Sequence, residues 1–347
     1  MNRKDEHISL AKSFHKPHLT DFDDVRVIHH SLPELQVADV SLATTLAQQT
    51  ISNPFYINAM TGGSEKTKKI NEQLALVARE TQLAMATGSV SAALKDSIVR
   101  DSFTIVRETN PNGVLLANVG AGTSLENAQA AVDLLQADAL QIHLNAPQEL
   151  VMPEGDRDFR NWLADITHIV AHLSVPVIVK EVGFGMTRET ITQLITSGVQ
   201  AIDISGRGGT SFTQIENARR SKREFSYLVD FGQSTVQSLL EANQVTAQFE
   251  LIASGGIRTA YDIFKALCLG AQSVGVSGTI LNELLTNGVE ATIELVQQWQ
   301  QELQTLLALT GCQTIADTQK VPLLLTGDVR AWCDARAISL QTYANRS

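Results

Sequence analysis

The sequence predicts a (β/α)8 TIM barrel with an N-terminal extension and a C-terminal helical addition. Three observations support this fold class. From Pro54 onward, short apolar runs rich in Val, Ile and Leu alternate with turns and helical stretches, which is the pattern of repeated βα units. Eight such runs follow one another, the number that closes a parallel barrel. The 347 residues exceed the roughly 250 of a typical barrel and leave room for additions at both ends.

The strands and helices can be placed from the period of the apolar residues. The eight expected strands begin near Phe55, Ala84, Val114, Ala139, Val177, Ala201, Glu250 and Ser273. Helical periodicity is clearest in 65–81, 124–135, 158–172, 187–196, 233–241 and 260–269. Residues 289–309 are expected as the helix after the eighth strand, and 326–338 as a terminal helix. The loop 206–232 is long for a barrel, and long loops in compact domains are usually functional.

A doubly wound parallel sheet is the alternative fold. It predicts an early Gly-x-Gly-x-x-Gly fingerprint, whereas the first strand here ends in Met60-Thr61-Gly62-Gly63. We expect two parts: residues 1–50 as a basic arm and connector, and residues 51–347 as the barrel with its C-terminal helices. The arm is either a solvated tail or a segment that folds over an anionic ligand.

Composition narrows the class of protein. Hydrophobic residues make up 44% and charged residues 18%, which is typical of a packed globular chain. The net charge of −10 argues against nucleic-acid binding, which needs a basic face. The three cysteines are far apart and suggest neither a disulfide framework nor a metal site. Residues 1–18 lack the apolar core of a signal peptide, and no apolar run is long enough to span a membrane, so we expect a soluble cytoplasmic protein.

One strand carries a line of polar residues where apolar ones are usual. Alternation places Gln141, His143 and Asn145 on one face of this strand, and Gln148 and Glu149 follow just past its end. Strands of parallel sheets are usually apolar on both faces, and each buried polar group without a partner costs about 1–3 kcal/mol. The line therefore predicts a ligand pocket at the carboxyl ends of the strands.

Two glycine-rich loops predict a phosphate site. Residues 254–258 follow the seventh strand and 275–279 follow the eighth, which is where barrels bind phosphate through backbone N–H groups and a helix N-terminus. Glycine lets the backbone approach the oxygens, and Arg258 can add a charge-assisted fork. Ordinary tight turns are the alternative explanation.

Lys180 and Glu149 each allow more than one interpretation. Alternation aims Lys180 into the barrel mouth, where it needs an anion, an ion pair with a neighbouring strand, or a Schiff-base role. The loop 205–210 offers several N–H donors and room for a flat ring. Glu149 is either an exposed glutamate or the single carboxylate that Mg²⁺ commonly uses together with ligand phosphates and waters.

Taken together, these stretches closely resemble the type 2 isopentenyl diphosphate isomerases, which are flavin-dependent enzymes. The resemblance runs nearly the full chain. It is carried by Arg3-Lys4-Asp5-Glu6-His7, residues 60–63, His143-Leu144-Asn145 with Gln148-Glu149, and residues 152–157, 180–185, 205–210 and 254–258. The glycine loops recur in other FMN barrels, whereas the arm, the polar line and residues 180–185 together are highly specific.

The resemblance implies a set of roles for these residues. FMN would lie across the barrel mouth, with its phosphate on Gly256, Arg258, Ser277 and Gly278 and the rest near Thr61, Gly62, Ser89, Asn118, Lys180, Ser205 and Thr210. Lys180 would stabilise the anionic reduced flavin. The substrate diphosphate would bind Arg3, Lys4, His143 and Asn145, with Mg²⁺ bridging it to Glu149, and Gln148 would lie against the isoprenoid carbons.

The implied reaction interconverts isopentenyl and dimethylallyl diphosphate by adding one proton and removing another, without net redox. The resemblance also implies reduced flavin, with NADPH as the reductant. Gln148 is the expected catalytic residue, as a positioning or relay group, because a neutral amide has no pKa suited to proton abstraction. We further expect a homo-oligomer, a tetramer or octamer.

One departure and two rival functions accompany this interpretation. Many family members carry a basic residue shortly after Gly88-Ser89 that touches the diphosphate, whereas Ser91 is found here. An FMN-dependent hydroxy-acid oxidase would share the barrel but keep a histidine and arginine pair after strand seven that is absent from this sequence. A non-catalytic phosphate-binding barrel would leave the inward polar line without a purpose. Gln141, the deepest of these amides, receives no role from the sequence.

Overall fold

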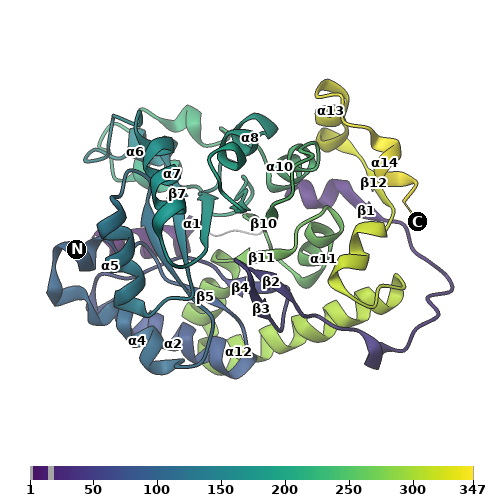
Figure 1. Cartoon of the computed structure of the whole chain (residues 1–347), viewed down its shortest axis with the longest axis horizontal. Helices are drawn as coiled ribbons and strands as arrows, with labels where there is room; N and C mark the ends of the chain where they lie inside the picture. Colours follow the sequence, from purple (N-terminus) through teal and green to yellow (C-terminus); the bar gives the residue numbers. More distant parts are fainter. Residues whose placement is uncertain (1–2, 15–18, 347) are drawn as a thin grey trace.

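The eight predicted strands close into a parallel barrel (Figure 1). The computed structural model describes residues 3–14 and 19–346, without the side chains of Arg3, Lys4 and Ala11. The barrel order is β10-β11-β4-β5-β6-β7-β8-β9. Its strands are β4 (Phe55–Ile57), β5 (Met85–Ala86), β6 (Leu115–Gly120), β7 (Ala139–Leu144), β8 (Val177–Glu181), β9 (Ala201–Asp203), β10 (Glu250–Ser254) and β11 (Ser273–Val276). The TIM barrel prediction is confirmed, and each strand begins within one residue of its predicted start.

Helices follow the strands and cover the outside of the barrel, as the βα pattern predicts. The six helices predicted from periodicity are α2 (Glu65–Thr81), α5 (Leu125–Leu135), α7 (Trp162–His172), α8 (Arg188–Thr196), α10 (Thr235–Ala242) and α11 (Ala260–Cys268). α7 begins later than predicted because Asp158 binds the backbone and side chain of Arg160 and holds a turn there. Three short elements between β5 and β6 were not predicted: α3 (Ser91–Lys95), η3 (Ser97–Val99) and α4 (Asp101–Thr109).

The helix after the eighth strand is longer than its sequence period indicates. α12 spans Gly278–Leu309, and Gly288 (φ 88°, ψ −174°) interrupts its helical geometry. The predicted helix 289–309 is the part beyond this kink. Periodicity missed the first part because the glycine breaks the pattern where the helix changes direction.

The two chain extensions pack against each other, although the termini lie on opposite sides of the view in Figure 1. After η1 (Asp21–Asp24), β1 (Val25–Val27) pairs antiparallel with β12 (Leu323–Leu325). These extensions also contain η2 (Val37–Asp39), η5 (Ile315–Lys320), α13 (Gly327–Ala335), where 326–338 was predicted, and α14 (Leu340–Ala344). A further short helix, η4 (Ser226–Leu228), lies in the long loop 206–232.

A hairpin fills the amino-terminal end of the barrel. β2 (Thr44–Leu46) and β3 (Gln49–Ile51) pair antiparallel, and their apolar side chains join the cluster of barrel-interior residues Leu116, Ile178 and Ile252. The turn residues Ala47 and Gln48 have φ of 49° and 63°, and their N–H groups donate to the Glu250 carboxylate at 2.8 and 3.2 Å. Burial of each large apolar side chain stabilises this plug by roughly 1.5–3 kcal/mol.

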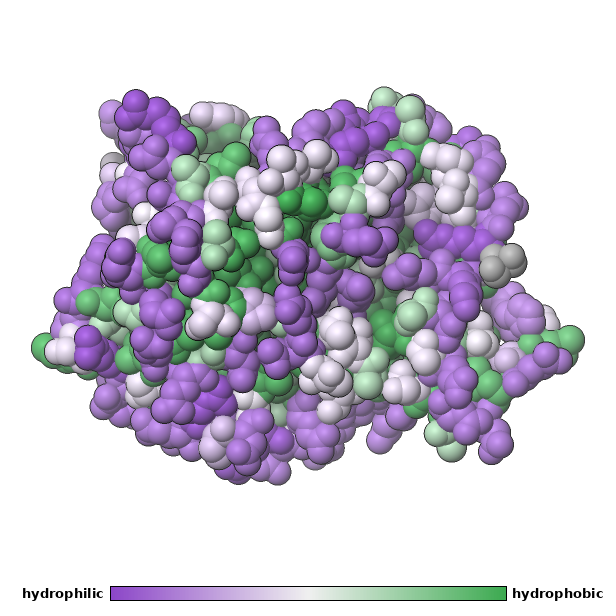
Figure 2. Space-filling model, in the orientation of Figure 1, coloured by the Kyte–Doolittle hydropathy of each residue, from purple (hydrophilic) through white to green (hydrophobic). Residues whose placement is uncertain are grey.

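The N-terminal arm is a docked helix. α1 (Arg3–Phe14) lies against α2 and against α9 (Phe212–Ala218), with Ile8 buried beneath it. The solvated-tail alternative is therefore wrong for these residues. On the face in Figure 2, hydrophilic residues cover most of the surface and apolar ones show mainly in recesses. Within the described residues, no helix is both long and apolar enough to cross a membrane.

Candidate active site

A cavity of about 680 Å³ opens at the carboxyl ends of the strands. It brings together most of the predicted site residues: Thr61, Ser89, Asn118, His143, Asn145, Gln148, Glu149, Lys180, Ser205, Thr210, Gly256, Arg258, Ser277 and Gly278. Gly62 lies behind this lining, where a Cβ would fall 2.1 Å from the Phe103 ring. The side chains of Arg3 and Lys4 lie outside the described residues, so their predicted contacts stay predictions.

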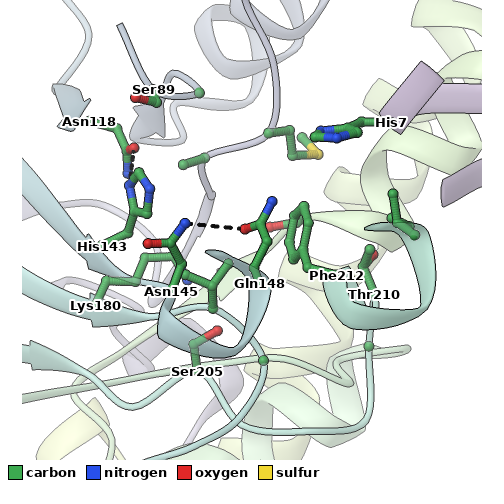
Figure 3. Close-up of a pocket in the computed structure, with 18 of the residues that line it drawn as sticks. His7, Ser89, Asn118, His143, Asn145, Gln148, Lys180, Ser205, Thr210 and Phe212 are labelled. Carbon is green, nitrogen blue, oxygen red and sulfur yellow. Dashed lines mark hydrogen bonds between the residues drawn. The ribbon is translucent and has the colours of Figure 1, made fainter. Parts of the chain in front are cut away.

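The polar line on β7 belongs to a hydrogen-bonded network inside the barrel. Register pairs Asn118 with Gln141, and Asn118 Nδ2 donates to Gln141 Oε1 at 3.1 Å. Asn118 Oδ1 lies 2.9 Å from His143 Nδ1 (Figure 3). Gln141 Nε2 donates to Asn58 Oδ1 at 3.1 Å, and Asn58 Nδ2 donates to Asp203 Oδ2 at 3.0 Å. Gln141 thus connects the cavity wall to a buried carboxylate, which is the role that the sequence did not reveal.

Lys180 shares this carboxylate. Its Nζ lies 3.6 Å from Asp203 Oδ2 and donates to the backbone oxygen of Glu181 at 2.7 Å. Asp203 also accepts from Ser254 Oγ at 2.7 Å and from the Ser205 N–H at 3.1 Å. The ion pair with a neighbouring strand, one of the alternatives for Lys180, is therefore present. Because the side chain also lines the cavity, the pair leaves the ammonium positioned toward a ligand.

Gln148 is held by a carboxylate that the sequence did not identify. α6 (Ala146–Val151) follows β7, and Gln148 Nε2 donates to Glu216 Oε1 on α9 at 3.1 Å. His7 Nε2 from α1 lies 3.0 Å from the same oxygen, and Asn145 Nδ2 lies 3.5 Å from Gln148 Oε1. In Figure 3, Gln148 lies between the His143 side of the pocket and His7. The arm thereby reaches the residue expected beside the reacting carbons.

The environment of Glu216 keeps it ionised. Burial of the side chain alone would raise its pKa, but the close contact with His7 and the hydrogen bonds from Gln148 and Arg219 outweigh this and lower the pKa of Glu216 to about 2. The carboxylate is therefore an acceptor throughout the neutral pH range. It fixes the Gln148 amide so that its N–H points to Glu216 and its oxygen points toward Asn145.

The glycine loops lie together at the opposite end of the cavity. Gly255 and Gly256 have φ of 94° and 74°, and a Cβ on Gly256 would fall 2.9 Å from the backbone of Gly208. α12 begins at Gly278, and its N-cap Ser277 makes no side-chain capping bond. The first N–H groups of α12 are consequently available to an anion.

Comparison with known proteins gives the family. A model of the FMN-dependent dehydrogenase family matches residues 145–323. An isopentenyl-diphosphate delta-isomerase of Latilactobacillus sakei is 52% identical over 340 residues, covering 98% of this chain and 97% of that protein. An isopentenyl-diphosphate delta-isomerase of Staphylococcus saprophyticus is 45% identical over 98% of both chains. The chain belongs to the isopentenyl-diphosphate delta-isomerase family. The resemblance found in the sequence is confirmed, and the FMN-dependent dehydrogenase match fits the type 2 branch of these isomerases.

Solved structures share the fold at low identity. A mandelate oxidase variant with a monooxide FMN adduct superposes with a TM-score of 0.65 at 18% identity, over 92% of each chain. A flavocytochrome b2 mutant with benzoylformate gives 0.65 at 17% identity, over 92% of this chain and 79% of that one. These likenesses show the barrel alone, so the hydroxy-acid oxidase alternative has no support beyond the fold.

The residues present fit an FMN molecule. Thr61 Oγ1 lines the cavity and is buried without a hydrogen-bond partner among the described residues. The close packing of Gly256 on Gly208 and the open start of α12 form a cradle suited to a phosphate. The guanidinium of Arg258 is held by two carboxylates, Asp23 and Asp262, at 2.8–3.0 Å. Its predicted contact with the FMN phosphate stays a prediction.

Both carboxylate oxygens of Glu149 accept hydrogen bonds. Its Oε1 accepts from Asn145 Nδ2 at 2.8 Å and its Oε2 from the Asp156 N–H at 2.9 Å. Arg157 closes this polar turn by donating to the Met152 oxygen at 2.9 Å. Within the described residues, no group of three or more His, Cys, Asp or Glu side chains could hold a metal alone. The predicted contact of Glu149 with Mg²⁺ stays a prediction.

The departure at Ser91 has a structural counterpart. Ser91 Oγ lies 3.0 Å from Ser89 Oγ, so the polar group that Ser91 brings to this part of the site is a neutral hydroxyl. Lys95, at the other end of the same short helix α3, also lines the cavity. This face of the site therefore retains a positive charge one helical turn away.

Proposed function

We propose that the protein isomerises isopentenyl diphosphate to dimethylallyl diphosphate, and the reverse, at the barrel mouth on reduced FMN. The near-full-length likeness to isopentenyl-diphosphate delta-isomerases supports the substrate and reaction. The observation that carries the proposal is the polar line of β7 and α6, which ends in a Gln148 amide fixed between Asn145 and Glu216. Such a constellation orients groups around a small ligand and lacks the His and Arg pair of a hydride-removing site.

Different residues of the chain would contact different parts of the substrate. The diphosphate would lie toward His143 and Asn145, with Arg3 and Lys4 from the arm as further donors. Gln148 would lie against the isoprenoid carbons, where its fixed amide positions the carbon that gains or loses a proton. α1 would cover the ligand and keep water from a cation-like transition state.

FMN, when bound, supplies an electron-rich ring that exchanges protons with the substrate. Lys180 would hold positive charge near the ring and favour its anionic reduced form, and Asp203 would fix the direction of the ammonium. Thr61, Ser89, Asn118, Ser205 and Thr210 would contact the ring and ribityl chain, with Gly256, Arg258, Ser277 and Gly278 at the phosphate. Gly62 does not line the cavity, so its expected contact with the flavin stays a prediction.

Further parts of the proposal concern partners and place of action. Mg²⁺ would bridge the diphosphate to Glu149, and NADPH would reduce the flavin. The enzyme would act in the cytoplasm as a homo-oligomer, a tetramer or octamer, because closed symmetric assemblies are the usual state of such enzymes. The charge of −10 argues against a nucleic-acid partner, so an anionic substrate would have to be held by donors within the site.

Two measurements test this proposal. The purified protein should be yellow and release FMN on denaturation. Incubation with isopentenyl diphosphate, Mg²⁺ and dithionite or NADPH should produce dimethylallyl diphosphate. A protein that takes up no FMN, or that turns over a 2-hydroxy acid but not isopentenyl diphosphate, would refute the proposal.

A further inference from the structure

A single guanidinium joins three carboxylates at the edge of the cavity. Arg219 follows α9, and its Nη1 lies 2.5 Å from Glu216 Oε2. Its Nη2 lies 2.9 Å from Glu154 Oε1, and its Nε lies 3.3 Å from Glu6 Oε2. These carboxylates come from α9, from the turn after α6, and from the arm helix α1. With 16% of its side chain exposed, Arg219 is largely shielded from solvent screening.

At other points, α1 makes hydrogen bonds to uncharged partners and apolar contacts. Ser64 Oγ donates to Asp5 Oδ1 at 2.8 Å, and Lys12 Nζ donates to the backbone oxygen of Leu285 at 3.2 Å. Ile8 is buried with 6% of its surface exposed. These contacts fasten the arm to α2 and α12, but none of them reaches Gln148 on α6 or its partner Glu216. That connection is made through Glu6, Arg219 and the His7 contact with Glu216.

The docked arm places Glu6 near two other carboxylates. Glu6, Glu154 and the buried Glu216 would repel one another without a cation between them. Arg219 removes this repulsion because its planar fork has donors pointing in three directions, which a lysine ammonium on a flexible stem reproduces poorly. We propose that Arg219 is a positioning residue that latches α1 over the cavity and holds the Glu216 carboxylate beside Gln148. This inference rests on the proposed isomerase function.

Arg219 would affect both the docking of α1 and the pH dependence of the reaction. The groups that face Glu216 are His7 from α1, Gln148 from α6 and Arg219 from α9, with Glu6 and Glu154 beyond Arg219. Loss of the guanidinium removes one of the contacts that lower the pKa of Glu216, so protonation of this group moves to higher pH. The same loss removes the link between Glu6 on the arm and Glu216 beside Gln148, and leaves the His7 contact with Glu216.

The variants Arg219→Met and Arg219→Lys test the latch, with Arg220→Met as the matched control. Arg220 is the next residue, and it binds Glu224 and the Val151 backbone instead of the arm. In FMN-loaded protein, Arg219→Met should speed hydrogen exchange of the α1 amides roughly tenfold or more, as expected for loss of a charge-assisted bond. It should also raise the KM for isopentenyl diphosphate and move the acid limb of kcat/KM to higher pH.

The second variant separates charge from geometry. Arg219→Lys should keep the acid limb near that of the unaltered enzyme but still show fast α1 exchange, because it retains the charge and loses the fork. It also serves if Arg219→Met does not fold. The proposal would be overturned if the Arg219 variants matched Arg220→Met both in the hydrogen-exchange rate of the α1 amides and in the acid limb of kcat/KM. If the unaltered protein does not isomerise the substrate, the proposed function fails, while the exchange measurement still decides whether Arg219 latches the arm.

Discussion

The buried pair of Lys180 and Asp203 yields the sharpest test of the site. In Asp203→Asn, the ammonium loses its carboxylate and keeps the Glu181 backbone oxygen and a 3.5 Å contact with Ser254. Breaking a buried pair by removing one partner costs about 3–5 kcal/mol, and the remaining contacts favour the lower end. For a chain of 347 residues, about 3 kcal/mol corresponds to a fall in Tm of roughly 4 °C.

A double-mutant cycle measures whether the pair acts as a unit. Lys180→Met alone leaves Asp203 with its donors from Asn58, Ser254 and Ser205, and should also destabilise the protein. The double variant removes both charges, so it should be at least about 1 kcal/mol more stable than the sum of the single losses indicates. Thermal and urea unfolding of FMN-free protein give these values. Additive losses, with a coupling below about 0.5 kcal/mol, would refute the reasoning.

Fluorescence titration with FMN extends the same cycle to function. If Lys180 contacts the flavin, Lys180→Met weakens FMN binding in both the presence and the absence of the Asp203 carboxylate. Equal FMN affinity in the unaltered protein and in Lys180→Met would remove this lysine from the cofactor site.

Three further predictions concern the frame and the reacting end. Glu241 accepts bonds from Arg188 and Arg336, and Glu241→Gln should lower the Tm measurably at pH 7. Burial alone would raise the pKa of Glu241, but the arginine bonds lower it to about 2. The difference in stability between Glu241→Gln and the unaltered protein should therefore persist above pH 4.5 and shrink as the pH falls toward 2. Urea unfolding at each pH would measure this difference. Gly256→Ala places a Cβ against backbone at a φ of 74°, so the purified variant should lose its bound FMN, as absorbance would report; a fully yellow variant contradicts the cradle. Gln148→Asn should keep FMN but lose most turnover in the isomerase assay, and near-normal turnover would show that the fixed amide is dispensable.

The barrel and the inward polar line could be predicted because both follow from period-2 alternation. Alternation places Gln141 and His143 on one face of β7, and the structure has them in one network with Asn118. The same rule could have found Asp203, since Ile202 and Ile204 alternate with it and point the acid inward. A single acid between two isoleucines forms no longer polar line, so it stands out less in the sequence than the pattern of β7.

Glu216 and the docked arm could not be predicted from local pattern. Glu216 lies on a short helix within a long loop, where no period identifies an inward face. The contact between Glu6 and Arg219 spans 213 positions, and only the tertiary fold brings its two side chains together. The length of the loop 206–232 was the one signal in the sequence that marked this region as functional.

The β2–β3 hairpin makes the barrel a tube that is sealed at its base. Under the proposed function, protons exchanged with solvent would then pass the same opening as the substrate, beneath α1. Isopentenyl diphosphate could be recovered from a reaction in deuterated solvent. Its deuterium content would then report how often solvent reached the site while the ligand was bound. The hairpin at the base of the barrel would in this way make solvent exchange a measure of how often α1 opens at the other end.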